Sequence, residues 1–370
     1  MNGANGYFSY EDIDSTGAQY RMIIGKRSNG KTFGALLKVL MNYIENGKQS
    51  AYIRRYREDF VGKLGRQLFE GVENTINIAE LTNGEWDCIS YYSGAWYLAY
   101  HDKKIVRDEK PFCYGFAINQ MEHYKSTSYP NITLVVFDEF LSRDFYLTNE
   151  FVLFMNVLST IIRQRDDVIV YMLGNTVTQY CPYFDEMGIN IKKMQQGSID
   201  IVKFGDSKLK VAVEFAPQTE GVTRKSDVYF AFNNPHLKMI TDGEWEFDIY
   251  PHMTYKYLPK DIKAIYFIEF NDELLQCEII KTDESNGYFT FIHRKTSELK
   301  DEKNKKTVIF SNHVTADRRY EKRITKPITE RGKLYAQLLF SEKTFFQDNS
   351  VGECVHNYIE WSKTTLPFRS

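Results

Sequence analysis

Residues 25–32 combine glycines, a lysine and a hydroxyl side chain at the spacing of a phosphate-binding loop. They follow the pattern Gly-x-x-x-x-Gly-Lys-Thr and read Gly25-Lys26-Arg27-Ser28-Asn29-Gly30-Lys31-Thr32. The glycines let backbone N–H groups turn towards a phosphate chain, and a helix that starts there adds partial positive charge. In such a loop the lysine reaches the β- and γ-phosphates, and the threonine hydroxyl coordinates magnesium. The pattern predicts a nucleotide triphosphatase; a glycine-rich turn before a core helix is the alternative.

A pair of acids at the end of an apolar segment is suited to hydrolysis. Residues 132–137 read Ile-Thr-Leu-Val-Val-Phe, which predicts a buried strand, and Asp138 and Glu139 follow directly. In phosphate-loop enzymes an aspartate at this place holds magnesium, and a glutamate after it can polarise the attacking water. A solvated turn has the same composition. The guanine-specifying pattern Asn-Lys-x-Asp is absent from the sequence, which disfavours a GTPase.

The next apolar segment, residues 168–173, ends at Gly174-Asn175-Thr176. The amide of Asn175 at this place can sense a γ-phosphate and align water beside Glu139. An ordinary Gly-Asn turn is the competing interpretation.

Two arginines, Arg163 and Arg165, close an apolar helix that we expect to begin at Thr148-Asn149. Arginine suits the end of a helix for reasons of dipole alone. Because residues i and i+2 point in different directions, one arginine could instead face a neighbouring subunit as an arginine finger. Their spacing does not decide which.

Two further segments carry cations. Lys125 lies in the polar loop 119–131, where a surface lysine is the plain interpretation. The run Arg54-Arg55-Tyr56-Arg57 follows the short apolar segment 51–53. Its mixture of guanidinium and aromatic groups suits contact with phosphate or a nucleic-acid backbone, and equally a solvated strand end.

Composition limits the class of protein. The net charge of −2 over 370 residues gives no global signal for nucleic acid, so a polyanion contact must be local. Apolar runs are far shorter than the roughly 18–20 residues that span a bilayer, and the polar, acidic N-terminus does not resemble a secretory signal. The five cysteines are odd in number and never spaced Cys-x-x-Cys, and the histidines lack ligand spacing. We therefore expect reduced thiols in a cytosol, no structural metal and no membrane contact.

Strand-like and helix-like segments alternate in the first half of the chain, which is typical of a parallel α/β sheet. Composition becomes polar and turn-rich after about residue 215. We expect an N-terminal phosphate-loop domain over 1–216, a connecting segment over 217–250 and a smaller C-terminal α/β domain over 251–370.

Taken together, these segments resemble the DNA-packaging ATPases of phi-29-like small tailed bacteriophages over residues 20–190. Several separate segments agree in order and spacing, whereas beyond about residue 215 the resemblance is faint. The shared segments are the loop 25–32, Tyr52-Ile53-Arg54-Arg55-Tyr56, Lys125-Ser126 with Tyr129-Pro130-Asn131, Val136-Phe137-Asp138-Glu139-Phe140, Arg163-Gln164-Arg165, and Asn175 ahead of Pro182-Tyr183-Phe184.

The resemblance implies a RecA-like core with a mainly parallel sheet, of the additional-strand, catalytic-glutamate class. It implies a homo-oligomeric ring, a pentamer in this family, that uses ATP and Mg²⁺ to drive double-stranded DNA into a prohead. Such a ring works in the host cytoplasm, transiently at the portal vertex. The implied partners are double-stranded DNA bound without regard to sequence, the prohead portal and the ring itself; whether a scaffold RNA takes part stays open.

The resemblance also implies roles for residues at matching positions. The loop 25–32 would bind ATP, Thr32 and Asp138 would hold the metal, and Glu139 would activate water. Arg163 would be a finger acting on the neighbouring subunit, Lys125 a second group acting in trans, and Arg57 a DNA contact in the pore.

The family's C-terminal domain looks like an RNase H-type nuclease that has lost its metal-binding carboxylates. Here Glu269, Asp272 and Glu278 lie along the first two expected strands of that domain, so the sequence leaves nuclease activity open.

Two other functions remain at this point. A nucleotide-dependent switch or assembly factor would bind ATP and a protein partner without moving DNA. A small-molecule or nucleotide kinase would need a lid with several arginines, and no such cluster is obvious.

Overall fold

The computed structural model describes residues 8–120, 127–142, 146–217 and 250–363, the last range without positions 255, 284, 298, 300–306, 314 and 342. The chain forms two compact units, residues 1–246 and 247–370. Of the expected connecting segment 217–250, all but the two end residues lie outside the described residues. The two units are considered separately.

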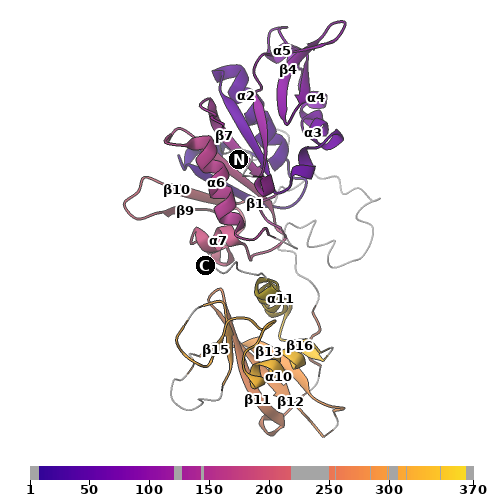
Figure 1. Cartoon of the computed structure of the whole chain (residues 1–370), viewed down its shortest axis with the longest axis vertical. Helices are drawn as coiled ribbons and strands as arrows, with labels where there is room; N and C mark the ends of the chain where they lie inside the picture. The colour runs from indigo at the N-terminus through magenta and orange to yellow at the C-terminus, as the bar shows by residue number, and fades with distance from the viewer. Residues whose placement is uncertain are drawn as a thin grey trace. The chain divides into compact units, whose positions relative to one another are not determined.

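A single mixed sheet forms the centre of the N-terminal unit (Figure 1). Strands β6, β2, β7, β8, β1 and β10 run parallel, and β3, β4, β5 and β9 extend the sheet by antiparallel pairing. The parallel strands are buried along most of their length, as expected when helices cover both faces. From edge to edge the strands are β3 (Cys88–Tyr92), β4 (Ala95–His101), β6 (Cys113–Ala117), β2 (Gln49–Arg54), β7 (Ile132–Asp138), β8 (Ile169–Asn175), β1 (Tyr20–Gly25), β10 (Lys210–Phe215) and β9 (Ile199–Lys203), with β5 (Ile105–Arg107) paired to β4.

Strand β8 lies between β1, which leads into the phosphate loop, and β7, which ends in the acidic pair. This is the additional strand of the class that the sequence resembles. The expected α/β class with a mainly parallel sheet is confirmed.

Two long helices cover opposite faces of this sheet. Alternate residues of β7 point to opposite sides. Leu134 and Val136 join the core beneath α2 (Lys31–Asn46), whereas Phe137 packs on Phe154 of α6 (Glu150–Ile162), with ring centroids 4.8 Å apart. Helix α6 begins where expected, after Asn149 at its N-cap position, but Asn149 has left-handed backbone angles and its side chain makes no capping bond.

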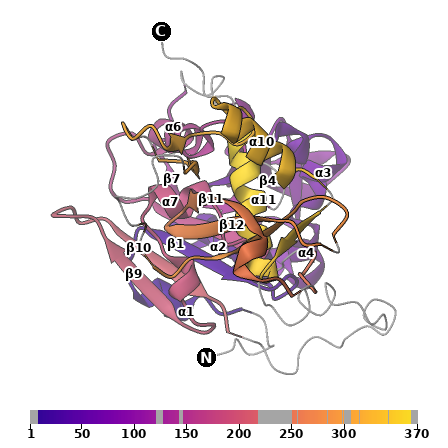
Figure 2. The ribbon, with the colours of Figure 1, turned by 90° about the horizontal axis from the view of Figure 1, so that it is seen from below.

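Shorter elements complete the N-terminal unit. Helix α1 contacts β10, and Figure 2 shows β10 and β9 side by side at one edge of the sheet. The short helices are α1 (Glu11–Ser15), η1 (Arg57–Phe60), α3 (Lys63–Gln67), α4 (Glu70–Thr75), α5 (Ile78–Leu81), α7 (Pro182–Glu186) and η3 (Ile191–Lys193).

The C-terminal unit, orange to yellow in Figure 1, is built on a second sheet of order β15-β14-β11-β12-β13-β16. Strands β11, β12 and β13 form an antiparallel meander, and β14 and β15 add in parallel beside β11. Strand β16 pairs in parallel with β13 at the other edge, and the RNase H-like character expected for this domain stays a prediction. Its elements are η4 (Pro259–Asp261), β11 (Ile262–Phe270), β12 (Glu273–Ile280), β13 (Phe289–Arg294), β14 (Ile309–Ser311), β15 (Tyr320–Glu321), α10 (Glu330–Leu339), β16 (Thr344–Phe346) and α11 (Asn349–Lys363).

A membrane-crossing helix, judged by length and apolar character, does not occur among the described residues.

Candidate active site

A cavity of about 530 Å³ opens at the carboxyl ends of the parallel strands, where α/β sheets bind their ligands. The structure brings together here most of the site residues that the sequence predicts. The lining residues are Arg27, Ser28, Asn29, Gly30, Lys31, Thr32, Phe33, Asp138, Glu139, Leu141, Ser142, Leu173, Gly174, Asn175 and Val177.

The loop 25–32 has a backbone that its glycines permit. Gly30 stands at the start of α2 with φ of +86°, a left-handed conformation that side-chain-bearing residues rarely adopt. A Cβ atom on Gly25 would lie 2.8 Å from Cβ of Ala216, so this position has no room for a side chain. The loop therefore needs both glycines in order to wrap tightly between β1 and α2.

Lys31 is turned back onto the loop and is only 5% exposed. Its Nζ donates to the carbonyls of Gly25 and Lys26, at 3.1 and 2.8 Å, and to Oδ1 of Asn29 and Asn175, at 3.0 and 3.4 Å. Burial lowers the pKa of Lys31 to about 7, against the opposing effect of the Asp138 carboxylate. The ammonium group is thus held at the centre of the loop by neutral oxygens.

Asp138 and Thr32 supply a pair of oxygen ligands. The Thr32 hydroxyl lies 3.2 Å from Oδ2 of Asp138, which is 4% exposed. Magnesium prefers hard oxygen ligands and commonly uses one or two of them from the protein, so this pair fits the ion. Tyr52 donates its hydroxyl to the same Oδ2 at 2.5 Å and so fixes the carboxylate.

Glu139 projects into the cavity from a strained backbone. Its φ is +60° and its side chain is 60% exposed, with Oε2 2.5 Å from an Arg54 guanidinium nitrogen. Arg54 also lies 3.4 Å from Asp138 Oδ2. In this arrangement one carboxylate oxygen of the glutamate is paired with a cation.

Tyr52 and Arg54 were not predicted as site residues. The composition of the run Arg54–Arg57 predicts a phosphate contact or a solvated strand end. In the structure Arg54 binds the acidic pair, and Arg55 forms a buried bidentate pair with Glu150, at 2.7 and 2.9 Å. Residues 52 and 54 share one face of β2, which neighbours β7. That i, i+2 spacing beside the acidic strand is the signal that could have identified them.

Asn175 ends β8 in register with Gly25 of β1. This pairing sets its amide beside the loop, where Oδ1 accepts from Lys31. The structure therefore groups Asn175 with the phosphate loop.

The two arginines after α6 differ in their contacts. Arg165 donates to the carbonyls of Pro130 and Ile132 at 3.0 and 2.6 Å, so it fixes the chain that enters β7. Arg163 is exposed and donates to the carbonyl of Thr127 at 3.0 Å. Helix α6 starts near the carboxyl end of β7 and runs back along the sheet. Arg163 therefore lies near the amino ends of the parallel strands, whereas the phosphate loop lies at their carboxyl ends.

The last two predicted residues lie away from the cavity lining or outside the described residues. Arg57 begins η1 just beyond the carboxyl end of β2; its side chain is exposed, and its backbone N–H donates to Oδ1 of Asn119 at 3.2 Å. Lys125 falls in 121–126, outside the described residues.

Comparison with known proteins agrees with this geometry. A family model described as podovirus DNA encapsidation protein (Gp16) matches residues 4–196. The DNA packaging protein of Bacillus phage B103 is 26% identical over 170 residues, which are 45% of this chain and 47% of that protein. The DNA packaging protein of Bacillus phage phi29 is 26% identical over 165 residues, 44% of each chain. The match thus spans about half the length of these relatives.

Two solved structures share the fold over nearly the whole chain. The Phi-28 gp11 DNA packaging motor has a TM-score of 0.53 and 19% identity, covering 98% of this chain and 100% of that one. The bacteriophage Phi-29 viral genome packaging motor assembly has a TM-score of 0.54 and 17% identity, covering 95% and 98%. On the strength of the family match over more than half of its length, the chain belongs to the podovirus DNA encapsidation (Gp16) family.

Proposed function

We propose that this protein is an ATP-hydrolysing motor that moves double-stranded viral DNA into a prohead. The observation that carries the proposal is the convergence of Lys31, Thr32, Asp138 and Glu139 on one cavity in a chain of this family. The relatives named DNA packaging proteins support the DNA-moving role. The motor would act in the host cytoplasm, at the portal vertex of the prohead.

The proposed roles follow from the contacts. Backbone N–H groups of the loop and the Lys31 ammonium bind the phosphate chain, and Asn175 lies close enough to Lys31 to respond to its position. Thr32 and Asp138 hold Mg²⁺, which supplies charge neutralisation on the phosphate oxygens. Glu139 accepts a proton from the attacking water once Arg54 has released it.

We assign Arg163 to the neighbouring subunit's site. Helix α6 has 13 residues and so spans about 20 Å, which keeps Arg163 far from its own loop. A side chain at the amino ends of the parallel strands can reach a nucleotide only on another copy of the chain. Each site of the proposed ring, a pentamer as in the resembled family, would then be shared by two subunits, with Lys125 as a second group acting in trans.

The DNA contact is assigned to Arg57. Its exposed side chain follows the carboxyl end of β2, and the nucleotide cavity lies at the carboxyl ends of the same parallel strands. Since the chain's net charge is −2, the affinity for DNA must come from local basic side chains that contact the phosphate backbone, without base recognition.

The deciding experiment measures ATP turnover with and without double-stranded DNA and empty proheads. A motor is expected to turn over faster with both, and to render the DNA resistant to nuclease inside the prohead. Slow turnover that ignores DNA would indicate the switch or assembly factor instead, and phosphate transfer to a small acceptor would indicate a kinase.

Mixed assemblies test the shared site. Arg163→Ala subunits keep Lys31, and Lys31→Ala subunits keep the arginine, so each is expected to hydrolyse ATP poorly alone. Mixtures should regain activity, because some interfaces pair an intact loop with an intact arginine. The matched control mixes Lys31→Ala with Arg66→Ala, an exposed arginine of α3, and should show only the activity of the Arg66→Ala subunits. If no ratio of co-assembled Arg163→Ala and Lys31→Ala exceeds the sum of the separate activities, Arg163 does not act in trans.

A further inference from the structure

The segment before β1 contacts the phosphate loop from the side away from the cavity. The backbone N–H of Phe8 donates to the carbonyl of Asn29 at 2.9 Å. The hydroxyl of Tyr10 donates to the carbonyl of Lys31 at 2.5 Å. Two peptide groups of the loop are therefore held by residues that the proposed ATPase chemistry does not use.

The ring of Tyr10 is fixed in one orientation. It is 7% exposed and lies edge-on to the rings of Phe8 and Tyr171, with centroids 5.0 and 5.3 Å away. A Cβ atom on Gly34 would lie 2.7 Å from Cε2 of Tyr10, so the ring rests directly on the backbone of α2. Its hydroxyl has little freedom to point elsewhere than at Lys31.

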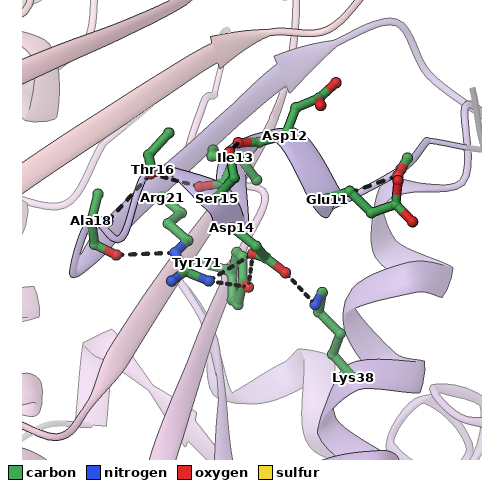
Figure 3. Close-up of polar contacts among 11 residues, drawn as sticks. Glu11, Asp12, Ile13, Asp14, Ser15, Thr16, Ala18, Arg21, Lys38 and Tyr171 are labelled. Atoms are coloured by element: carbon green, nitrogen blue, oxygen red, sulfur yellow. Dashed lines mark hydrogen bonds and ion pairs between the residues drawn. The ribbon is translucent and has the colours of Figure 1, made fainter. Parts of the chain in front are cut away.

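Asp14 anchors this segment to the elements around the loop, as Figure 3 shows. Its carboxylate binds Arg21 of β1 at 2.6 Å, Lys38 of α2 at 2.5 Å and the hydroxyl of Tyr171 of β8. The Lys38 ammonium also lies 5.3 Å above the ring of Tyr10. One acid thus ties α1 to the strand before the loop, the helix after it and the strand beside it.

Peptide planarity links these outer contacts to the inner face of the loop. In a trans peptide the carbonyl and the following N–H point in opposite directions. Tyr10 holds the carbonyl of Lys31 from outside, which directs the N–H of Thr32 to the other side. Phe8 does the same for the N–H of Gly30 by holding the carbonyl of Asn29.

We propose that Tyr10 is a positioning residue of the nucleotide site, which holds the Lys31–Thr32 peptide so that its N–H faces the phosphate chain. The inference rests on the proposed ATP-binding function and adds a residue that the loop pattern does not contain. Its expected signature is on nucleotide binding, because Tyr10 touches the loop and not Glu139 or Asp138.

The test is Tyr10→Phe, which keeps the ring and removes the hydroxyl. Loss of one hydrogen bond to the loop is expected to raise the Kd for ATP and for ADP roughly 3- to 10-fold, with kcat changed less than twofold. Tyr43→Phe is the matched control: Tyr43 belongs to α2, the helix that Tyr10 packs against, and donates its hydroxyl to Asp108 at 2.7 Å, away from the loop. It should leave both nucleotide affinities unchanged.

A second pair of variants tests the same contact without touching the hydroxyl. Alanine normally stabilises a helix relative to glycine. Gly34→Ala is nevertheless expected to weaken ATP binding at least as much as Tyr10→Phe, because its methyl group displaces the ring. Gly71→Ala in α4, where a Cβ meets nothing within 4 Å, is the control and should not alter binding.

Thermal unfolding without nucleotide separates positioning from plain stability. If Tyr10→Phe and Tyr43→Phe lower the unfolding temperature equally while only the first weakens ATP binding, the positioning role holds. Equal ATP affinity of Tyr10→Phe and wild type would overturn the inference and leave the proposed function intact. Failure of the wild type to bind ATP would instead overturn the proposed function.

Discussion

The carboxylates of the two units stand in contrasting surroundings. In the N-terminal unit, Asp138 and Glu139 end a strand beside a cavity that also contains Lys31 and Thr32. In the C-terminal unit, Glu278 lies inside β12 and is bound by Tyr257 at 2.5 Å, Gln276 at 2.6 Å and His293 at 3.4 Å. Asp138 and Glu139 thus face a cavity that could hold a ligand, whereas the carboxylate oxygens of Glu278 are already hydrogen-bonded to neighbouring side chains.

The two glutamates of the C-terminal sheet also lie too far apart to share a pair of metal ions. Glu269 pairs with Leu274 and Glu278 with Ile265, so the two glutamates lie four residues apart along the sheet, about 13 Å. Two-metal nucleases need carboxylates around ions only about 4 Å apart. Among the described residues, the one group of three or more His, Cys, Asp or Glu side chains with ligand atoms within 4.8 Å of one another is Asp87, Cys88 and His101, in the N-terminal unit. An acid at the expected place in a sheet is therefore insufficient for catalysis without partners that leave its oxygens available.

The largest effect that would sharpen this contrast is expected from Glu139→Gln. It removes the proton acceptor and should lower ATP turnover by about 10²–10⁴ while ATP and Mg²⁺ still bind. The matched change in the other unit, Glu278→Gln, should leave turnover near wild type. Steady-state phosphate release and equilibrium ATP binding measure both; normal turnover by Glu139→Gln would contradict the assignment of the base.

ATP affinity should depend on pH through Lys31. Burial lowers its pKa to about 7, so the ammonium is already present below pH 7, and above it the free protein must take up a proton to bind the phosphates. The Kd for ATP is expected to rise by up to about tenfold per pH unit above 7.

Calorimetry of Glu139→Gln in two buffers of different ionisation enthalpy measures that proton directly without hydrolysis. A constant Kd from pH 7 to 9 with no proton uptake would show that Lys31 stays charged throughout.

A smaller effect is expected from Arg57→Ala. DNA affinity should fall several-fold and the slope of log K against log salt should flatten by about one, because one phosphate contact is lost. DNA-free ATP turnover should stay nearly intact. The control is Lys208→Ala, which removes an exposed cation just before β10, at the amino ends of the parallel strands. Loss of nucleotide binding by Arg57→Ala would place that residue in the active site.

The smallest effect is expected in the C-terminal unit. Burial raises the pKa of Glu278, but hydrogen bonds from His293, Tyr257 and Gln276 outweigh it and hold the pKa below the usual range. These bonds stabilise the unit above the unfolded-state pKa, and the stabilisation is lost as pH falls through the lowered folded-state value. Glu278→Gln should therefore cost about 1 kcal/mol of unfolding free energy at pH 7. Wild type and variant alike should show no metal-dependent DNA cleavage; cleavage lost on substitution would identify an active nuclease.

Local chemistry explains how much of the site the sequence could predict. The loop 25–32 and Asp138-Glu139 are contiguous, and the apolar segments around them fix their place at a sheet edge. The sequence does not identify Tyr52 and Arg54 as site residues, because they are 84 to 86 residues away from Asp138 in the chain. They meet it only through the pairing of β2 with β7. The sequence does not separate Arg163 from Arg165, since the chain leaves helical geometry at Arg163, where φ is +52°. The domain boundaries stay predictions, as do the catalytic, metal-binding and DNA-binding roles of the site residues.

Helix α6 connects chemistry at its two ends. The Glu150 carboxylate in its first turn is bound by Arg55 and Tyr183, and Arg55 also donates to the backbone carbonyls of Glu139 and Phe140. The start of the helix is thereby clamped to the peptide that carries the glutamate, and Arg163 follows its far end. A shift of that peptide would therefore be transmitted along a helix about 20 Å long to the residue after its far end. Under the proposed roles, the position of Glu139 and that of Arg163, which would serve the next subunit's site, are thus linked through one helix.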